Sequence, residues 1–349
     1  MKFWVKRARQ GRLSAPGYLC RFYCLVFLLA SASRAQSQQE VTPQAIPSQE
    51  TIHSQSNVVA IPALVKSAQG EVVYGLTAVD FVVEDDGAAQ PVRMDEVAEG
   101  EPVSLVVAIQ RGRRADFEFP RMRGLSAMLD PLLETGIGSV AIVEFDSHVQ
   151  TAQDFTGSSE KIAWTLKGLQ PGDGGAAILD AVDYAVKLLE KVPRERQRVL
   201  LLISETRDHG SETKLEDAVA ELGQSNTAVY ALAFSPSRSN ILDTMRGNNM
   251  SEMHPTPDLL APLVMLAQAM KKNMPETVAT MTGGEYEMFA TAKHFDARMV
   301  DFTNHLHSRY LLSIEPKNPH AGLHTLRVRL RDQGNRVVLA RGSYWAAGR

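Results

Sequence analysis

The chain has 349 residues, a formal net charge of −3, and 44% hydrophobic residues, enough apolar content for a globular core. Its excess of acidic side chains disfavours non-specific nucleic-acid binding, which needs lysines and arginines that neutralise phosphates. Both cysteines, Cys20 and Cys24, lie near the amino terminus. The rest of the chain can therefore form no disulfide or thiolate metal site, and it has no cysteine nucleophile.

Residues 1–35 have the features of a secretory signal peptide. They contain seven basic residues and no acid, an apolar stretch over 22–30, and small residues at Ser33 and Ala35. The apolar stretch is shorter than the ~20 residues that span a bilayer. We expect export to the periplasm or the extracellular space and no membrane span in the mature chain. A retained, uncleaved anchor is the alternative. Cleavage leaves 30 of the 37 basic residues against 40 acids, a net charge of about −10.

Two segments precede the main domain. Residues 36–50 are rich in Gln, Ser and Pro, which indicates a flexible linker. Residues 51–100 contain short apolar runs typical of strands, and Pro62 in the first run favours an edge position or a bulge. The pair Asp86-Gly87 predicts a hairpin. This β segment is too small to bury a good core by itself.

Residues 101–308 alternate apolar strands with amphipathic helices, which predicts a doubly wound, mostly parallel α/β sheet. Helical spacing predicts a helix over 119–133, and Pro275 and Gly283 bound another helix. A further helix is expected over 289–307. The scattered methionines of 236–275 indicate an adaptable surface rather than a metal site. The expected strands are 105–109, 140–145, 151–156, 199–204 and 228–234.

Residues 309–347 return to a strand pattern. In 324–331 leucine and valine alternate with Arg327, Arg329 and Arg331, a face that we expect to be exposed to solvent. Residues 335–340 are expected to close a hairpin through Gly334. Because neither flanking β segment is large enough alone, we predict that 51–100 and 309–347 pair into one β-sandwich, with the α/β domain inserted between them.

Four stretches, in this order along the chain, resemble von Willebrand factor type A domain proteins, specifically the secreted family seen in acidobacteria. None is specific alone, but together they span nearly the whole mature chain. They are Leu76–Phe81 with Glu84–Gly87, Gly174–Ala181, Val199–Gly210, and Tyr310–Leu312 with Pro316–Pro319.

The resemblance implies a divalent cation site at the carboxyl edge of the sheet, but this chain departs from it at every loop. In the family an Asp and two Ser come from the first loop, a Thr from the second and an Asp from the third, oxygens that suit Mg²⁺. Only the last of the five matching positions keeps a carboxylate, so we expect no metal and no cofactor. These positions are Gln110, Gly112, Arg114, Ala176 and Glu205.

The arginines of the first loop suggest a different kind of site. Arg111, Arg113 and Arg114 are placed where the metal lies in the family, and a guanidinium can bind a partner's carboxylate directly. We therefore predict a protein-binding module with a protein partner of unknown identity. Two alternatives remain: internal neutralisation, in which Glu205 or Asp208 pairs with Arg114, and a mobile, solvated basic loop. With either, the domain is inert and the protein has a structural role in the envelope.

An enzyme is the competing class of function. No His-Glu-x-x-His or Gly-x-Ser-x-Gly motif occurs, and Gly174-Gly175 lacks the lysine of a nucleotide-binding loop. Ser204, Glu205, Asp208 and His209 cluster at a strand end, where a catalytic group could lie. We expect no enzymatic activity, and a secreted hydrolase is the less favoured alternative.

Overall fold

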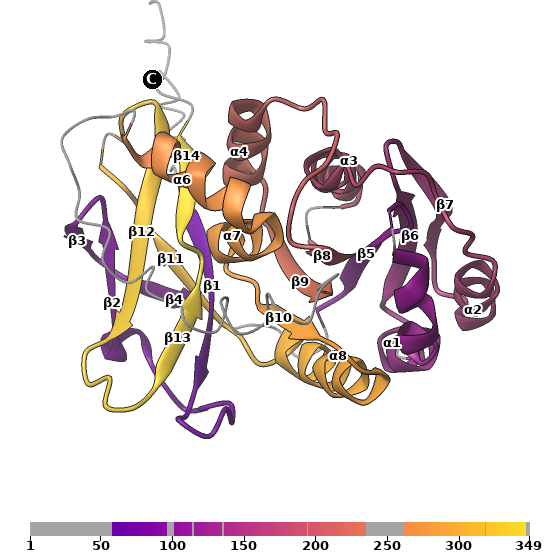
Figure 1. The fold of residues 1–349 in the computed structure, drawn as a ribbon. Coiled ribbons are helices and arrows are strands. Elements are labelled where there is room, and N and C mark those ends of the chain that lie inside the picture. Colours follow the sequence, from indigo (N-terminus) through magenta and orange to yellow (C-terminus); the bar gives the residue numbers. More distant parts are fainter. Residues whose placement is uncertain are drawn as a thin grey trace, which may run out of the picture. The chain divides into compact units, whose positions relative to one another are not determined.

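The computed structural model describes residues 58–95, 101–113, 115–134, 136–193, 195–234, 261–317 and 319–346. Residues 103–306 form an α/β part around a six-stranded sheet of order β10-β9-β8-β5-β6-β7 (Figure 1). All neighbouring strands are parallel except the antiparallel edge strand β7. The strands are β5 (Val103–Gln110), β6 (Ser139–Phe145), β7 (Val149–Thr156), β8 (Gln197–Ser204), β9 (Thr227–Phe234) and β10 (Tyr286–Phe289).

Helices cover both faces of this sheet and explain its continuous apolar strands, since every residue of β5 and β9 is buried. One core joins the sheet to α1, α2 and α8, and the other joins it to α3, α4, α6 and α7. The helices are α1 (Leu125–Glu134), α2 (Ser159–Lys167), α3 (Ile178–Glu190), α4 (Leu215–Gln224), α6 (Ala261–Lys272), α7 (Met274–Thr282) and α8 (Ala292–Leu306).

The two flanking β segments pair with each other, which confirms the predicted sandwich. Two four-stranded antiparallel sheets have the orders β13-β1-β11-β4 and β14-β12-β2-β3, so each contains strands from both ends of the chain. A single core lies between them, with Ile61 and Leu312 from one sheet and Phe81 and Leu326 from the other. The strands are β1 (Val59–Lys66), β2 (Phe81–Asp85), β3 (Ala88–Gln90), β4 (Arg93–Asp95), β11 (Tyr310–Ile314), β12 (Gly322–Leu330), β13 (Val337–Ala340) and β14 (Ser343–Ala346).

Close backbone packing joins the sandwich to the α/β part. A side chain at Gly223 of α4 would overlap the backbone and Cβ of Trp345 of β14, so only glycine permits this approach. Arg341, buried in the same joint, donates to the carbonyl oxygens of Gly223 and Ser343. Burial lowers the pKa of Arg341 to about 10.

Several local predictions are confirmed. Asp86 and Gly87 both have positive φ (47° and 82°) and connect β2 to β3, as the hairpin signal requires. Gly283 ends α7 in the left-handed conformation, with φ 78°. The half-buried pattern of β12 is also present, and Arg329 on its outer face pairs with Glu84.

Other predictions differ from the structure. The helix expected over 119–133 is divided at Arg123 and Gly124 into a 3-10 helix (Ala115–Met122), which contains Pro120, and α1. The hairpin expected through Gly334 is wrong, because β13 crosses to the other sheet and pairs with β1. Strand β1 is internal, although at Pro62 it pairs only with β11. Helix α2 and strand β10 were not predicted.

The expected signal peptide and linker lie outside the described residues, as do most of the methionines of 236–275. No helix among the described residues is long and apolar enough to cross a membrane.

Candidate functional site

Four loops meet at the carboxyl edge of the central sheet, where open α/β sheets usually bind ligands. Three of them follow β5, β6 and β8, and the fourth precedes α3. Backbone hydrogen bonds tie them together: Arg113 N–H donates to Asp173 (2.7 Å), Ala177 N–H to Asp146 (2.8 Å). Of the positions predicted from the sequence, those that the structure describes therefore gather at one place.

Gln110, the last residue of β5, has no exposed surface, and its amide is fully used inside the protein. Its Oε1 accepts the backbone N–H of Glu205 at 2.8 Å, and its Nε2 donates to Glu205 Oε1 at 3.2 Å. The same Nε2 lies 3.3 Å from the carbonyl oxygen of Gly112. The amide thus bridges the loops after β5 and β8.

Arg113 supplies the cation that faces Glu205. Its Nε lies 2.7 Å from Glu205 Oε1, and the side chain of Arg113 is 39% exposed whereas that of Glu205 is only 6% exposed. Burial raises the pKa of Glu205 above its usual value, and the positive charge of Arg113 opposes this rise. Arg113 holds a left-handed backbone, with φ 57°, which is unusual for a residue other than glycine.

Two further positions provide no side-chain oxygen. A Cβ on Gly112 would overlap the carbonyl oxygen of Gly175 and lie 2.8 Å from Asp146 Cβ, so no side chain fits there. Ala176 is buried and forms a reciprocal backbone bridge with His209, each N–H donating to the other's carbonyl at 2.8 Å.

Two aspartates of this edge escaped the sequence analysis. Asp146 directly follows β6, and its Oδ2 lies 2.9 Å from Arg111 Nη2. Asp173 Oδ1 accepts hydrogen bonds from the backbone N–H groups of Gly175 (2.8 Å) and Ser147 (3.0 Å). Both bonds lower the pKa of Asp173, and the bond from Gly175 has the larger effect. The signal that could have found Asp146 is its place at the carboxyl end of an apolar strand.

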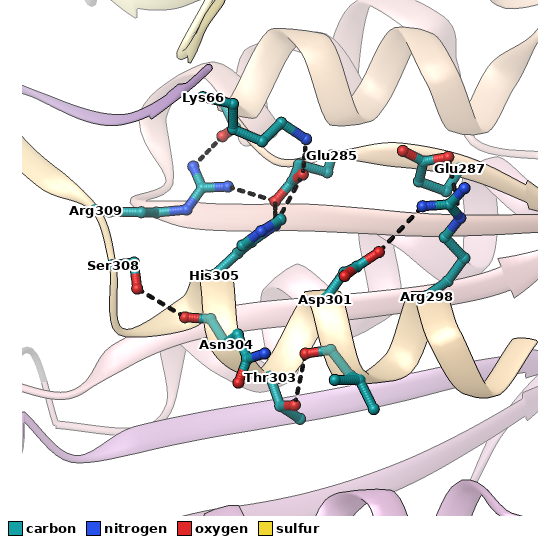
Figure 2. Close-up of polar contacts among 12 residues, drawn as sticks. Lys66, Glu285, Glu287, Arg298, Asp301, Thr303, Asn304, His305, Ser308 and Arg309 are labelled. Atoms are coloured by element: carbon teal, nitrogen blue, oxygen red, sulfur yellow. Dashed lines mark hydrogen bonds and ion pairs between the residues drawn. The ribbon is translucent and has the colours of Figure 1, made fainter. Parts of the chain in front are cut away.

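A second charged cluster lies at the amino end of β10, where a cavity of about 280 Å³ opens beside β9 and α8. Figure 2 shows Lys66, His305 and Arg309 directed at the carboxylate of Glu285, with closest distances of 2.9, 2.9 and 3.6 Å. Burial alone would raise the pKa of Glu285, but these three groups outweigh it and lower that pKa to about 2. The cluster links β1 and the start of β11 to the start of β10.

Comparison with known proteins assigns the central part of the chain. The family model of the von Willebrand factor type A domain matches residues 130–257. The similarity to this family is thus shown for the central part of the chain. Among curated proteins, none matches this chain.

Several solved structures resemble this chain at low identity. The conserved hypothetical protein BatB from Bacteroides thetaiotaomicron is 14% identical over 58% of this chain and 97% of its own, with a TM-score of 0.39. Proximal thread matrix protein 1 from the mussel byssus, with a zinc-occupied MIDAS motif, is 14% identical over 60% of this chain and 46% of its own, with a TM-score of 0.41. The pilus adhesin SpaC from Lactobacillus rhamnosus GG is 11% identical over 65% of this chain and 34% of its own, with a TM-score of 0.39.

Within the von Willebrand factor type A domain, the matched residues include Ala176 and Glu205 but begin after the first loop. The structure pairs Glu205 with Arg113, whereas the sequence left Arg114 as the partner to consider. Arg114 lies outside the described residues. Asp208 accepts hydrogen bonds from Ser211 Oγ (2.5 Å) and the Leu179 N–H (3.0 Å).

Proposed function

We propose that this protein is an exported, non-enzymatic protein-binding module whose von Willebrand factor type A domain works without a divalent metal. The binding surface in this proposal is the arginine loop, defined as residues 110–114. The group that it binds is a carboxylate of a protein partner, which a guanidinium holds through paired hydrogen bonds.

The observation that carries the proposal is the occupation of the Glu205 carboxylate by Gln110 and Arg113. A hard cation such as Mg²⁺ requires several oxygen ligands in a near-octahedral arrangement. Glu205 is the only carboxylate among the family's metal positions, and its Oε1 already accepts from Gln110 Nε2 and lies 2.7 Å from a guanidinium. These residues do not fit a divalent cation. In its place, Arg113 provides the positive charge.

Arg113 is also the arginine best placed to contact a partner. Its Nε is fixed on Glu205, and among the described residues its terminal amino groups have no hydrogen-bond partner. The side chain is 39% exposed. A guanidinium that is anchored at one edge and open at the other is preorganised for a carboxylate, which reduces the entropy lost on binding.

Arg111 has a different role in this proposal. Its side chain is 22% exposed, and it pairs with Asp146 at 2.9 Å and Glu144 at 3.7 Å. These acids neutralise most of its charge, so Arg111 contributes to the shape of the loop more than to its potential.

The same ion pairs favour a second candidate, an envelope structural protein with an inert domain. If both described arginines are neutralised internally, the edge offers no net charge to a partner. A hydrolase is less favoured, because Ser204 Oγ donates to the carbonyl of Glu205 and no hydrogen bond joins Ser204 to His209 within the part of the chain that the structure describes.

A pull-down from the envelope of the producing cell tests the proposal. Arg113→Ala with Arg114→Ala should lose the captured protein, while Arg93→Ala, an exposed arginine of the sandwich, should retain it. EDTA should change nothing. Capture that persists without both arginines supports the inert domain, and capture abolished by EDTA contradicts a metal-free site.

Export has its own test. Residues 1–35 fused to an alkaline phosphatase that is active only outside the cytoplasm should give activity. Substitution of Leu25, Leu28 and Leu29 by Asp should abolish it, because the apolar segment is what the export machinery recognises. An active fusion after this change would contradict a signal peptide.

A further inference from the structure

Four side chains with metal-binding chemistry converge at one end of the β2–β12–β14 sheet, far along the chain from the domain's usual metal positions. Asp85 ends β2 and Asp86 begins the turn to β3, and His320 and His324 lie before and within β12. Asp85 and His324 are buried, at 8% and 3% exposure. The side chains of Asp86 and His320 are 38% and 41% exposed. The cluster is therefore buried at Asp85 and His324 and accessible to solvent at Asp86 and His320.

Each of these side chains uses one polar atom in a hydrogen bond to a neighbouring group of the chain. Asp85 Oδ2 accepts from the Tyr344 hydroxyl at 3.0 Å, and Asp86 Oδ1 accepts from the N–H and hydroxyl of Thr325, both at 2.9 Å. His324 Nε2 lies 2.9 Å from the carbonyl oxygen of His320. A carbonyl only accepts, so this nitrogen must carry the proton.

His320 is arranged in the same way, with Nδ1 at 3.0 Å from the carbonyl oxygen of Ala321. Both rings thus donate one N–H to a backbone carbonyl. This second bond fixes the tautomer and orientation of a histidine and is the usual outer contact of a metal-bound imidazole. In the neutral rings, the remaining nitrogens, His320 Nε2 and His324 Nδ1, carry the lone pairs.

The ligand atoms of Asp86, His320 and His324 lie within 4.8 Å of one another, and Asp85 adjoins them through His324. His324 Nδ1 lies 2.8 Å from Asp86 Oδ2 and 3.3 Å from Asp85 Oδ1, and His320 Nε2 lies 3.3 Å from Asp86 Oδ2. Two of them, Asp85 Oδ1 and His324 Nδ1, are buried and have no hydrogen-bond partner. Lone pairs of neutral rings directed at carboxylate oxygens repel each other, so this arrangement calls for a positive charge among them.

We propose that Asp85, Asp86, His320 and His324 bind a divalent transition-metal ion, with Zn²⁺ as the best-fitting one. Two imidazoles and two carboxylates are a ligand set that Zn²⁺ accepts in tetrahedral sites. With metal–ligand bonds of about 2.0–2.1 Å, neighbouring ligand atoms in a tetrahedron are about 3.3 Å apart. The distance of 3.3 Å between His324 Nδ1 and Asp85 Oδ1 equals that spacing.

The orientation of the two histidine rings decides which side chains can bind the ion without moving. His320 stacks on His324 with centroids 3.9 Å apart and planes 19° from parallel. Since an imidazole binds a metal in its own plane, two stacked rings cannot both direct a lone pair at one ion. Asp85, Asp86 and His324 form the inner set, and His320, the more exposed ring, rotates to complete it.

A proton is the competing occupant. Although burial opposes it, the neighbouring carboxylates of Asp85 and Asp86 raise the pKa of His324 to about 10, so a metal must displace a proton from Nδ1. The test must therefore separate a metal site from an imidazolium bound to two carboxylates.

Isothermal titration of the chelator-treated protein with ZnCl₂ makes this separation, supported by the visible absorption of Co²⁺ in a four-coordinate site. We expect one equivalent of Zn²⁺ to bind and to raise the melting temperature. Asp86→Asn, which keeps an acceptor for Thr325, and His320→Ala, at an exposed position, should each weaken binding at least tenfold.

Two control variants make the result specific. His294→Ala removes an exposed histidine of α8, and His148→Ala removes the histidine nearest Asp146 and Asp173, whose ligand atoms also lie within 4.8 Å of one another. Both controls should bind like the wild type. Absence of Zn²⁺ binding, or binding that Asp86→Asn and His320→Ala leave unchanged, overturns the proposal and leaves a protonated His324 in the cluster.

Discussion

Gln110 and Glu205 form a reciprocal pair across the carboxyl edge of the sheet, although 95 positions separate them. The backbone N–H of Glu205 donates to Gln110 Oε1 at 2.8 Å, and Gln110 Nε2 returns a bond to Glu205 Oε1 at 3.2 Å. Both side chains are buried. An amide serves here because it both donates and accepts, whereas a carboxylate at position 110 would face the carboxylate of Glu205.

Replacing Gln110 by Leu should therefore destabilise the fold. The change leaves the buried N–H of Glu205 without its acceptor, which costs about 1–3 kcal/mol, and it removes one of the two donors that face Glu205 Oε1. Urea denaturation followed by circular dichroism measures the loss. Gln69→Leu, at an exposed loop position, should stay within about 0.5 kcal/mol of wild type. Equal losses in the two variants would show that the amide pair adds nothing.

The ion pair of Arg113 and Glu205 gives a second prediction. Arg113→Ala should lower the unfolding free energy by on the order of 1–2 kcal/mol at neutral pH. This is less than the cost of breaking a fully buried pair, since Arg113 is 39% exposed and solvent screens its charge. In the Glu205→Gln background the same change should cost much less.

The pH dependence of this loss follows from the raised pKa of Glu205. An acid whose folded pKa lies above the unfolded one stabilises the fold in its protonated form, and this contribution is lost as the pH rises through the folded pKa. Removal of Arg113 raises that pKa further. The difference between wild type and Arg113→Ala should thus be largest at neutral pH and shrink as the pH falls through the two folded-state pKa values of Glu205, which both lie above the ordinary 4.5. A constant difference from pH 4 to 8 would contradict the pairing.

Gly112 allows a matched comparison of two glycines in neighbouring loops. A Cβ at Gly112 would overlap the carbonyl of Gly175, whereas a Cβ at Gly174 meets nothing within 4 Å. Gly112→Ala should cost more than about 2 kcal/mol, because backbone must move, and Gly174→Ala should be nearly neutral. Chemical denaturation of both variants checks this. A neutral Gly112→Ala would mean that the loops after β5 and before α3 separate easily.

The fold could be predicted from the sequence largely because its signals are local. Runs such as Val199–Ser204 identify buried strands, and Asp86-Gly87 fixes a turn whatever surrounds it. The path of β13 could not be predicted in this way, because pairing with β1 or β12 depends on how two sheets pack, which a turn at Gly334 does not encode.

The candidate site could likewise be predicted only in part. Strand ends predict that Gln110 and Glu205 lie near each other, since parallel strands end at one edge. Which arginine reaches Glu205 depends on the positive φ of Arg113, a conformation that nothing in the local sequence demands. Asp146 was missed because its role comes from Arg111 in another loop rather than from its own neighbours.

Glu285 makes the stability of the fold sensitive to acid. Its pKa is lowered from 4.5 to about 2 by His305, Lys66 and Arg309, which outweigh the effect of burial. A carboxylate with a depressed folded pKa stabilises the fold above its unfolded pKa, and this contribution is lost as the pH falls through the folded value. At neutral pH the lowered pKa corresponds to on the order of 3 kcal/mol.

Glu285→Gln should remove that contribution. The variant should be clearly less stable than wild type at pH 7, and the difference should decline as the pH falls from about 4.5 to about 2. Unfolding free energies from guanidinium titrations at a series of pH values measure it. Glu315→Gln is the matched control, because its carboxylate is 46% exposed and an exposed ion pair stabilises little. If the Glu285→Gln difference stays constant across this range, the cluster in Figure 2 holds Lys66 and His305 by packing rather than by charge.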